Sequence, residues 1–157
     1  MTEDRPQAPQ LDPQTMTPAE LLAVVREIEA SQPHSLNNRM GIEITEVTPE
    51  RLVGTMPVQG NTQPFGLLHG GASVVLAETL GSTGANLHAG PGRMVVGVDI
   101  NATHHRSART GMVTGVATPI STGRTLSSWQ IVISDEDGKR LCTSRITCLV
   151  RERPPGS

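Results

Sequence analysis

Gln63-Pro64-Phe65-Gly66-Leu67-Leu68-His69-Gly70-Gly71 is the stretch that decides the fold, because it leads directly into a long apolar run that holds one carboxylate, Glu78. The glycine pair predicts a helix start, where backbone N–H groups have no partner within the helix. The residues around Glu78 are apolar: Val74, Val75, Leu76, Ala77 and Leu80. A carboxylate in such surroundings is costly unless it is paired or used, so we expect a buried Glu78 beside an anion-binding helix end. An anion-binding helix end and a carboxylate are the two groups that attack on an activated carbonyl group requires.

The segments around this stretch predict an α+β domain. Thr17-Pro18-Ala19-Glu20 is typical of a capped helix start, and that helix is expected to run to about residue 31. We expect strands near 41–48 and 51–58, the central helix near 70–88, and four more strands around 94–103, 110–120, 129–133 and 139–151. The 94–103 strand alternates with a period of two, and residues 135–138 form a hairpin turn. Consecutive strands with short turns indicate one antiparallel sheet, curled around the central helix.

Length and composition exclude several classes of function. The 157 residues predict one domain at 17–151, between a disordered tail (1–16) and a flexible end (152–157). A net charge of −2, with one Phe, one Trp and no Tyr, argues against nucleic-acid binding. No secretory signal or membrane-spanning run is recognised. Cys142 and Cys148 fall on one predicted strand, too far apart for a disulfide, so we expect them to be reduced and the protein to be cytoplasmic. No Cys/His spacing indicates a zinc site.

The stretch from Gln63 to Ser82 closely resembles the signature of the hotdog-fold acyl-CoA thioesterases. The likeness continues from Val96 to Arg109, through Trp129-Gln130-Ile131 and over 135–138, so that it covers about residues 36–150. Within the family, the chain is most similar to bacterial hydrolases of 1,4-dihydroxy-2-naphthoyl-CoA in menaquinone synthesis. It also resembles the proofreading thioesterases that clear misacylated carrier protein in enterobactin synthesis. The resemblance implies a long helix held in a curved antiparallel sheet, homodimers that pair into homotetramers, an active site between two subunits, and no metal or organic cofactor.

The same resemblance implies catalytic roles for five residues. Glu78 is implied to attack the thioester carbonyl carbon, as nucleophile or as base for a water, while the N–H of Gly70 polarises the carbonyl oxygen. Gln63 and His69 would orient the thioester and the attacking group, and Ser82 would hold the carboxylate or a water. Structural roles stay open beside these: a charge pair for Glu78, a turn glycine at Gly70, a helix cap for His69 and packing for Ser82.

A CoA-binding surface is also implied by the resemblance. Its residues are Gly97, His104, His105, Arg106, Ser107, Ser121, Thr122, Gly123 and Arg124. Arginine side chains and backbone N–H groups suit phosphate groups. Relatives often have histidine where this chain has Ser121, so we expect the phosphate contacts to differ here.

We therefore expect a thioesterase that hydrolyses aromatic acyl-CoA, with 1,4-dihydroxy-2-naphthoyl-CoA as the leading substrate. A misacylated aryl carrier protein is the first alternative. A non-catalytic acyl-CoA sensor is the second, although residues 1–40 show no basic helix-turn-helix pattern of the kind that a sensor would carry. A hotdog hydratase or dehydratase is the third, but these enzymes usually have their catalytic histidine in a different local motif.

Overall fold

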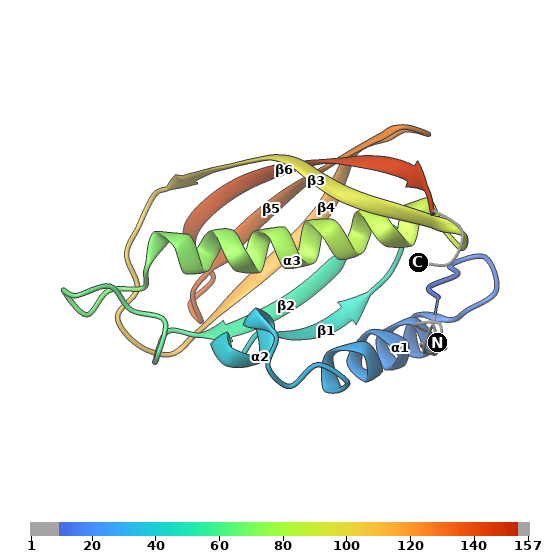
Figure 1. Cartoon of the computed structure of the whole chain (residues 1–157). Helices are drawn as coiled ribbons and strands as arrows, with labels where there is room; N and C mark the ends of the chain where they lie inside the picture. The colour runs from blue at the N-terminus through green and yellow to red at the C-terminus, as the bar shows by residue number, and fades with distance from the viewer. Residues whose placement is uncertain (1–9, 154–157) are drawn as a thin grey trace, which may run out of the picture.

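The computed structural model describes residues 10–153, which fold into one antiparallel sheet with a long helix across it (Figure 1). The sheet has six strands in the order β1-β2-β4-β5-β6-β3. In chain order the elements are α1 (Pro18–Ala30), α2 (Leu36–Met40), β1 (Glu43–Val47), β2 (Leu52–Pro57), α3 (Gly70–Ala89), β3 (Arg93–His104), β4 (Met112–Thr122), β5 (Leu126–Ser134) and β6 (Arg140–Glu152). The predicted α+β architecture is confirmed, in the arrangement that the hotdog resemblance implies.

Local signals set the helix ends. The N–H of Glu20 donates to Thr17 Oγ1 (3.4 Å) and the N–H of Thr17 donates to Glu20 Oε2 (2.7 Å), which confirms the predicted capping box at α1. Helix α2 has only five residues and was not predicted. It ends at Gly41 (φ +67°), and Asn37 on it accepts a hydrogen bond from Thr79 Oγ1 of α3 (2.9 Å). A tertiary contact thus stabilises a helix too short to persist alone.

Residues 10–16 of the predicted N-terminal tail form a turn around Asp12. The N–H of Gln14 donates to Asp12 Oδ1 (3.0 Å) and Thr15 Oγ1 donates to Asp12 Oδ2 (2.9 Å). Leu11 and Met16 pack against the core. This segment is therefore attached to the domain, while residues 1–9 and 154–157 lie outside the described residues.

Small residues let α3 lie close to the sheet. A Cβ at Gly81 would overlap Ile146 Cγ2 of β6, and a Cβ at Gly84 would come within 2.8 Å of the Trp129 ring. Trp129 is fully buried, and its Nε1–H donates to Ser127 Oγ (2.9 Å). The small residues of α3 thus allow close contact with side chains of β5 and β6.

Strand β3 contains a β-bulge that the sequence pattern did not predict. Gly97 is opposite Cys148 and Asp99 is opposite Thr147 on β6, so Val98 is an extra residue. Val95, Ile100 and Ala102 all pack against the core, whereas a strict period of two would put Val95 and Ile100 on opposite faces. The prediction of uninterrupted alternation is therefore wrong at Val98.

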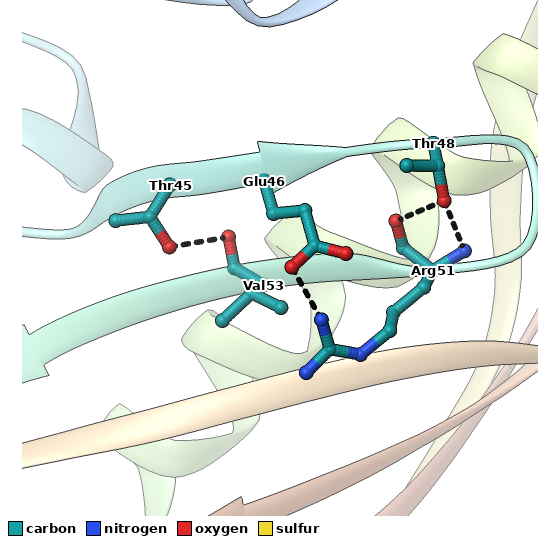
Figure 2. A network of polar contacts seen from close by, with 5 residues as sticks. All are labelled: Thr45, Glu46, Thr48, Arg51 and Val53. Carbon is teal, nitrogen blue, oxygen red and sulfur yellow. Dashed lines mark hydrogen bonds and ion pairs between the residues drawn. The ribbon is translucent and has the colours of Figure 1, made fainter. Parts of the chain in front are cut away.

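Strand β1 is the sheet edge opposite β3, and polar contacts join it to β2 in a hairpin (Figure 2). Thr48 Oγ1 donates to Arg51 O and accepts from the N–H of Arg51, both at 3.0 Å. Arg51 also pairs with Glu46, and both side chains are exposed, so this ion pair adds little stability. The hydrogen bonds between Thr48 and Arg51 thus stabilise the turn between β1 and β2.

The two cysteines of the chain, Cys142 and Cys148, are free and buried on β6, which agrees with the prediction that they form no disulfide. Among residues 10–153, no helix is both long enough and apolar enough to cross a membrane.

Candidate active site

The residues with predicted catalytic roles lie in two groups along α3. Gln63, His69 and Gly70 lie at its N-terminal end, whereas Glu78 and Ser82 lie two to three turns further along. Eight residues at a rise of about 1.5 Å put Gly70 and Glu78 about 12 Å apart along the helix axis. A carbonyl group bound at the N–H of Gly70 is therefore out of reach of the Glu78 carboxylate of the same chain. One chain does not place the predicted donor beside the predicted attacking group.

Most of the N–H groups at the start of α3 have partners. The N–H of Gly71 donates to His69 Nδ1 (2.9 Å), and the N–H groups of Ala72 and Ser73 donate to His69 O (2.9 and 3.4 Å). Within the part of the chain that the structure describes, the N–H of Gly70 has no acceptor. This N–H is therefore available to an acceptor from another molecule, such as the predicted oxyanion, at the positive end of the helix dipole.

His69 is the N-cap of α3, so the structural role considered for it is met. Because Nδ1 accepts the N–H of Gly71, we assign the ring proton to Nε2. In this tautomer the exposed side of the ring offers an N–H donor. The geometry therefore suits His69 to donate to a thioester and not to act as a base.

The loop between β2 and α3 extends past the N-terminal end of α3 and holds Gln63 in a tight turn (Figure 1). Gln63 Oε1 accepts the N–H of Phe65 (2.6 Å), and Gln63 O accepts the N–H of Gly66 (2.9 Å). Gly66 has φ +75°, a conformation that favours glycine. The amide oxygen of Gln63 is thus used inside the loop, and its NH₂ group is available to a ligand.

Glu78 is exposed in the single chain, which corrects the prediction that it is buried. Leu76, Ala77 and Leu80 are fully buried against the sheet. At about 100° per residue, the position of Glu78 turns to the opposite side of α3. Its carboxylate instead lies towards the β3 bulge, since a Cβ at Gly97 would lie 3.8 Å from Glu78 Oε1.

A cavity of about 210 Å³ lies between Glu78 and the bulge. Its other lining residues are Gly97, Val98, Asp99, Ile100 and Ile146. Gly97, which the resemblance places among the CoA-binding residues, therefore lies beside the predicted attacking carboxylate. The extra residue of the bulge helps to form the wall of this cavity.

Ser82 and Glu78 of α3 both lie close to Cys148 of β6. Burial raises the pKa of the Cys148 thiol, a hydrogen bond with the Ser82 hydroxyl lowers it, and the nearby Glu78 charge raises it. Cys148 is also opposite Gly97 in the β3–β6 register. Cys148 was not predicted as a site residue, because its place opposite Gly97 depends on the pairing of two strands that lie far apart in the sequence.

Four of the predicted CoA-binding residues, His104 to Ser107, begin at the last residue of β3, and His104 lies near the start of α3. His104 Nε2 is 2.9 Å from the position that a Cβ on Gly70 would occupy. His105 Nε2 forms a hydrogen bond with Thr143 Oγ1 (2.9 Å). The imidazole of His104 thus lies beside the predicted oxyanion donor.

The other four, Ser121 to Arg124, lie at the opposite end of the sheet. Arg93, the first residue of β3, donates through Nη2 to Arg124 O (2.8 Å), and the N–H of Gly123 donates to Leu126 O (2.8 Å). The full length of β3 separates this segment from His104. One chain therefore does not bring the two predicted CoA-binding segments together. Across residues 10–153 no group of three His, Cys, Asp or Glu side chains is placed to hold a metal ion.

Comparison with known proteins defines the class of this protein. The sequence profile of the thioesterase superfamily matches residues 65–142. The chain is 48% identical over 124 residues to the proofreading thioesterase EntH of Cronobacter turicensis, which covers 78% of this chain and 90% of that protein. The chain belongs to the thioesterase superfamily, and it is a thioester hydrolase.

Solved structures agree with this assignment. A thioesterase of class EC 3.1.2 from Haemophilus influenzae has a TM-score of 0.78 at 42% identity, covering 91% of this chain and 96% of that one. A mutant thioesterase from Pseudomonas aeruginosa has a TM-score of 0.78 at 43% identity, covering 82% and 94%. The hotdog fold is thus shared with enzymes of the same class.

Proposed function

We propose that this enzyme hydrolyses aromatic acyl thioesters carried on a phosphopantetheine arm, with misacylated aryl carrier protein as the leading substrate. The observation that carries this choice is the 48% identity over 124 residues to a protein named as a proofreading thioesterase. The sequence alone favours 1,4-dihydroxy-2-naphthoyl-CoA as the leading substrate, whereas the similarity to proofreading thioesterases favours the alternative, a misacylated carrier protein. CoA and carrier protein present the same arm, so the chemistry at the carbonyl group is shared.

In the proposed reaction the N–H of Gly70 in one subunit receives the thioester oxygen, and Glu78 of a second subunit attacks. Glu78 adds to the carbonyl carbon itself or removes a proton from a water that adds. The NH₂ of Gln63 and the Nε2–H of His69 donate to the carbonyl oxygen or the sulfur as charge develops. The C–S bond then breaks, water supplies the oxygen of the product acid, and the thiolate leaves and takes up a proton.

The shape of the chain supports a homodimer. Strand β3 is an edge strand of twelve residues, and its Val96 and Val98 are 41% and 57% exposed. A long exposed edge with apolar side chains is suited to pairing with a second copy. Antiparallel pairing of two β3 strands would bring residues 104–107 of one chain towards the start of β3 in the other, where residues 121–124 lie. The same arrangement would allow Gly70 and Glu78 of different chains to share a substrate.

The proposal includes pairing of two dimers into a homotetramer, as the family resemblance implies. It also places the enzyme in the cytoplasm, where two free, buried cysteines are ordinary. Light scattering on the purified enzyme would distinguish a dimer from a tetramer.

Complementation between two inactive variants tests the shared site. Glu78→Gln should lower thiol release from benzoyl-CoA by about 100-fold or more while CoA still binds. Gln63→Ala removes a donor that the first subunit supplies to the same site, so it should also lower thiol release. Mixed dimers should recover up to about a quarter of wild-type activity, because half of the dimers are mixed and each has one intact site. Normal turnover by Glu78→Gln would refute the assignment, and no recovery in mixed dimers would refute the two-chain site.

The substrate is tested separately with the wild-type enzyme. We expect kcat/KM on benzoyl carrier protein to exceed that on benzoyl-CoA and on 1,4-dihydroxy-2-naphthoyl-CoA. The opposite order would restore the CoA thioester as the leading substrate.

A further inference from the structure

We propose that Phe65 contacts the acyl group of the substrate and selects aromatic acyl groups over aliphatic ones. This inference rests on the proposed function and names the residue that sets its substrate class.

Phe65 is the most exposed large apolar side chain in residues 10–153, at 82% exposed. The next are Val98 at 57% and Leu36 at 56%. An aromatic ring left in water forgoes the stabilisation that burial would give it. A ring in this position is therefore suited to contact another molecule.

The loop that carries Phe65 is held by hydrogen bonds. The N–H of Phe65 donates to Gln63 Oε1 (2.6 Å), and the N–H of Leu68 donates to Ala108 O (2.8 Å). Thr62 and Leu68 form a β-bridge at the base of the loop. Phe65 thus points outward from a loop with a defined backbone, and its ring needs little reordering to receive a ligand.

The position of the loop brings this ring to the reacting end of the substrate. The loop continues directly into His69 and Gly70, and it extends past the N-terminal end of α3 (Figure 1). In the proposed reaction the carbonyl oxygen lies at the N–H of Gly70. The acyl group is bonded to that same carbonyl carbon, so it lies within reach of a side chain five residues earlier in the loop.

The composition of the chain makes Phe65 the aromatic residue available for this contact. The whole sequence has one Phe, one Trp and no Tyr. Trp129 is fully buried against Gly84 of α3. Stacking or edge-to-face contact with an aromatic acyl group therefore falls to Phe65, and such contacts add stabilisation beyond area burial.

The test compares Phe65→Leu and Phe65→Ala on benzoyl-CoA and hexanoyl-CoA, with thiol release as the readout. Phe65→Leu keeps an apolar side chain and removes the ring. We expect it to lower kcat/KM on benzoyl-CoA about five- to tenfold and to change that on hexanoyl-CoA less than about twofold. Phe65→Ala should lower both, with the larger loss on benzoyl-CoA. Leu36→Ala, which truncates another exposed apolar residue, is the control and should leave both values unchanged.

An unchanged ratio of the two kcat/KM values in Phe65→Leu would overturn this inference. So would an equal loss on both thioesters together with dissociation of the dimer in sedimentation, because the ring would then pack against the second subunit. A wild-type enzyme that hydrolyses neither thioester, nor any aroyl carrier protein, would refute the proposed function itself and this inference with it.

Discussion

His69 Nδ1 accepts the backbone N–H of Gly71 at 2.9 Å, so one imidazole both caps α3 and stands next to the N–H of Gly70. The hydrogen bond fixes the ring orientation before any substrate arrives. A donor that is already oriented stabilises developing charge without reorganising during the reaction. In the proposed reaction, therefore, the cap of the helix and the chemistry at its end would depend on the same side chain.

Substitution of His69 should separate these two roles. Asparagine is a good N-cap, so His69→Asn should leave the free energy of unfolding within about 0.5 kcal/mol, whereas His69→Ala should lower it by about 1 kcal/mol. Both changes remove the Nε2–H donor, so both should lower kcat by about 100-fold. Urea denaturation and thiol release measure the two effects. A His69→Ala enzyme as stable as wild type would show that the ring contributes nothing as a cap.

Gly84 lies against Trp129, and a Cβ there would come within 2.8 Å of the ring. Replacing glycine by alanine inside a helix normally gains about 1 kcal/mol, but overpacking costs about 1–3 kcal/mol. We expect Gly84→Ala to lower the free energy of unfolding by about 1 kcal/mol and to shift the emission of Trp129, the only tryptophan. The penalty should shrink in a Trp129→Phe background, because the smaller ring leaves room. A Gly84→Ala enzyme more stable than wild type would contradict this packing.

Features encoded by neighbouring residues were predictable from the sequence. The capping box at Thr17 and Glu20 depends on four consecutive residues, and the structure reproduces it. The long helix follows from an apolar run with a glycine pair before it, and it spans Gly70–Ala89 against a prediction of about 70–88. The antiparallel sheet follows from strands joined by short turns.

Features that depend on packing were not predictable. The bulge at Val98 shifts the register with β6. Gly97, directly before it, is a local signal for a bulge, but a glycine in a strand does not by itself fix which residue is extra. The exposure of Glu78 depends on which face of α3 the sheet covers, and apolar neighbours in sequence do not settle that. The distance between Gly70 and Glu78 follows from helix rise alone. The sequence does not show that the two residues would need to come from different chains to act on one substrate.

Cys142 and Cys148 should react slowly with thiol reagents in the native enzyme. Burial raises the pKa of both thiols, so little of the reactive thiolate is present near neutral pH. We expect no fast reaction with an aromatic disulfide reagent in buffer and reaction of both thiols in urea. Cys142→Ala leaves Cys148 as the single thiol and makes its reaction separately measurable. A fast native phase in that variant would show that the thiol beside Glu78 is reached by solvent.

Glu29 on α1 should make stability depend on pH. Burial raises the pKa of its carboxyl group, with a smaller lowering by Arg26 and a further raising by Glu43. Because the folded-state pKa lies above the ordinary value of 4.5, the folded state holds the proton more tightly than the unfolded chain does. This contribution to stability is fully present below the ordinary pKa and is lost as the pH rises through the folded-state pKa. Glu29→Gln removes the ionisation, so it should raise the Tm near neutral pH and have less effect near pH 4, a difference that thermal unfolding across this pH range would measure.

Glu27→Gln is the matched control for Glu29→Gln, since Glu27 lies on the same helix and is exposed. It removes the same charge from α1 without removing a carboxylate from a partly buried position. The rise in Tm near neutral pH should therefore appear in Glu29→Gln and be absent in Glu27→Gln. An equal rise in both variants would assign the effect to the overall charge of the helix, and the burial of Glu29 would then not be its cause.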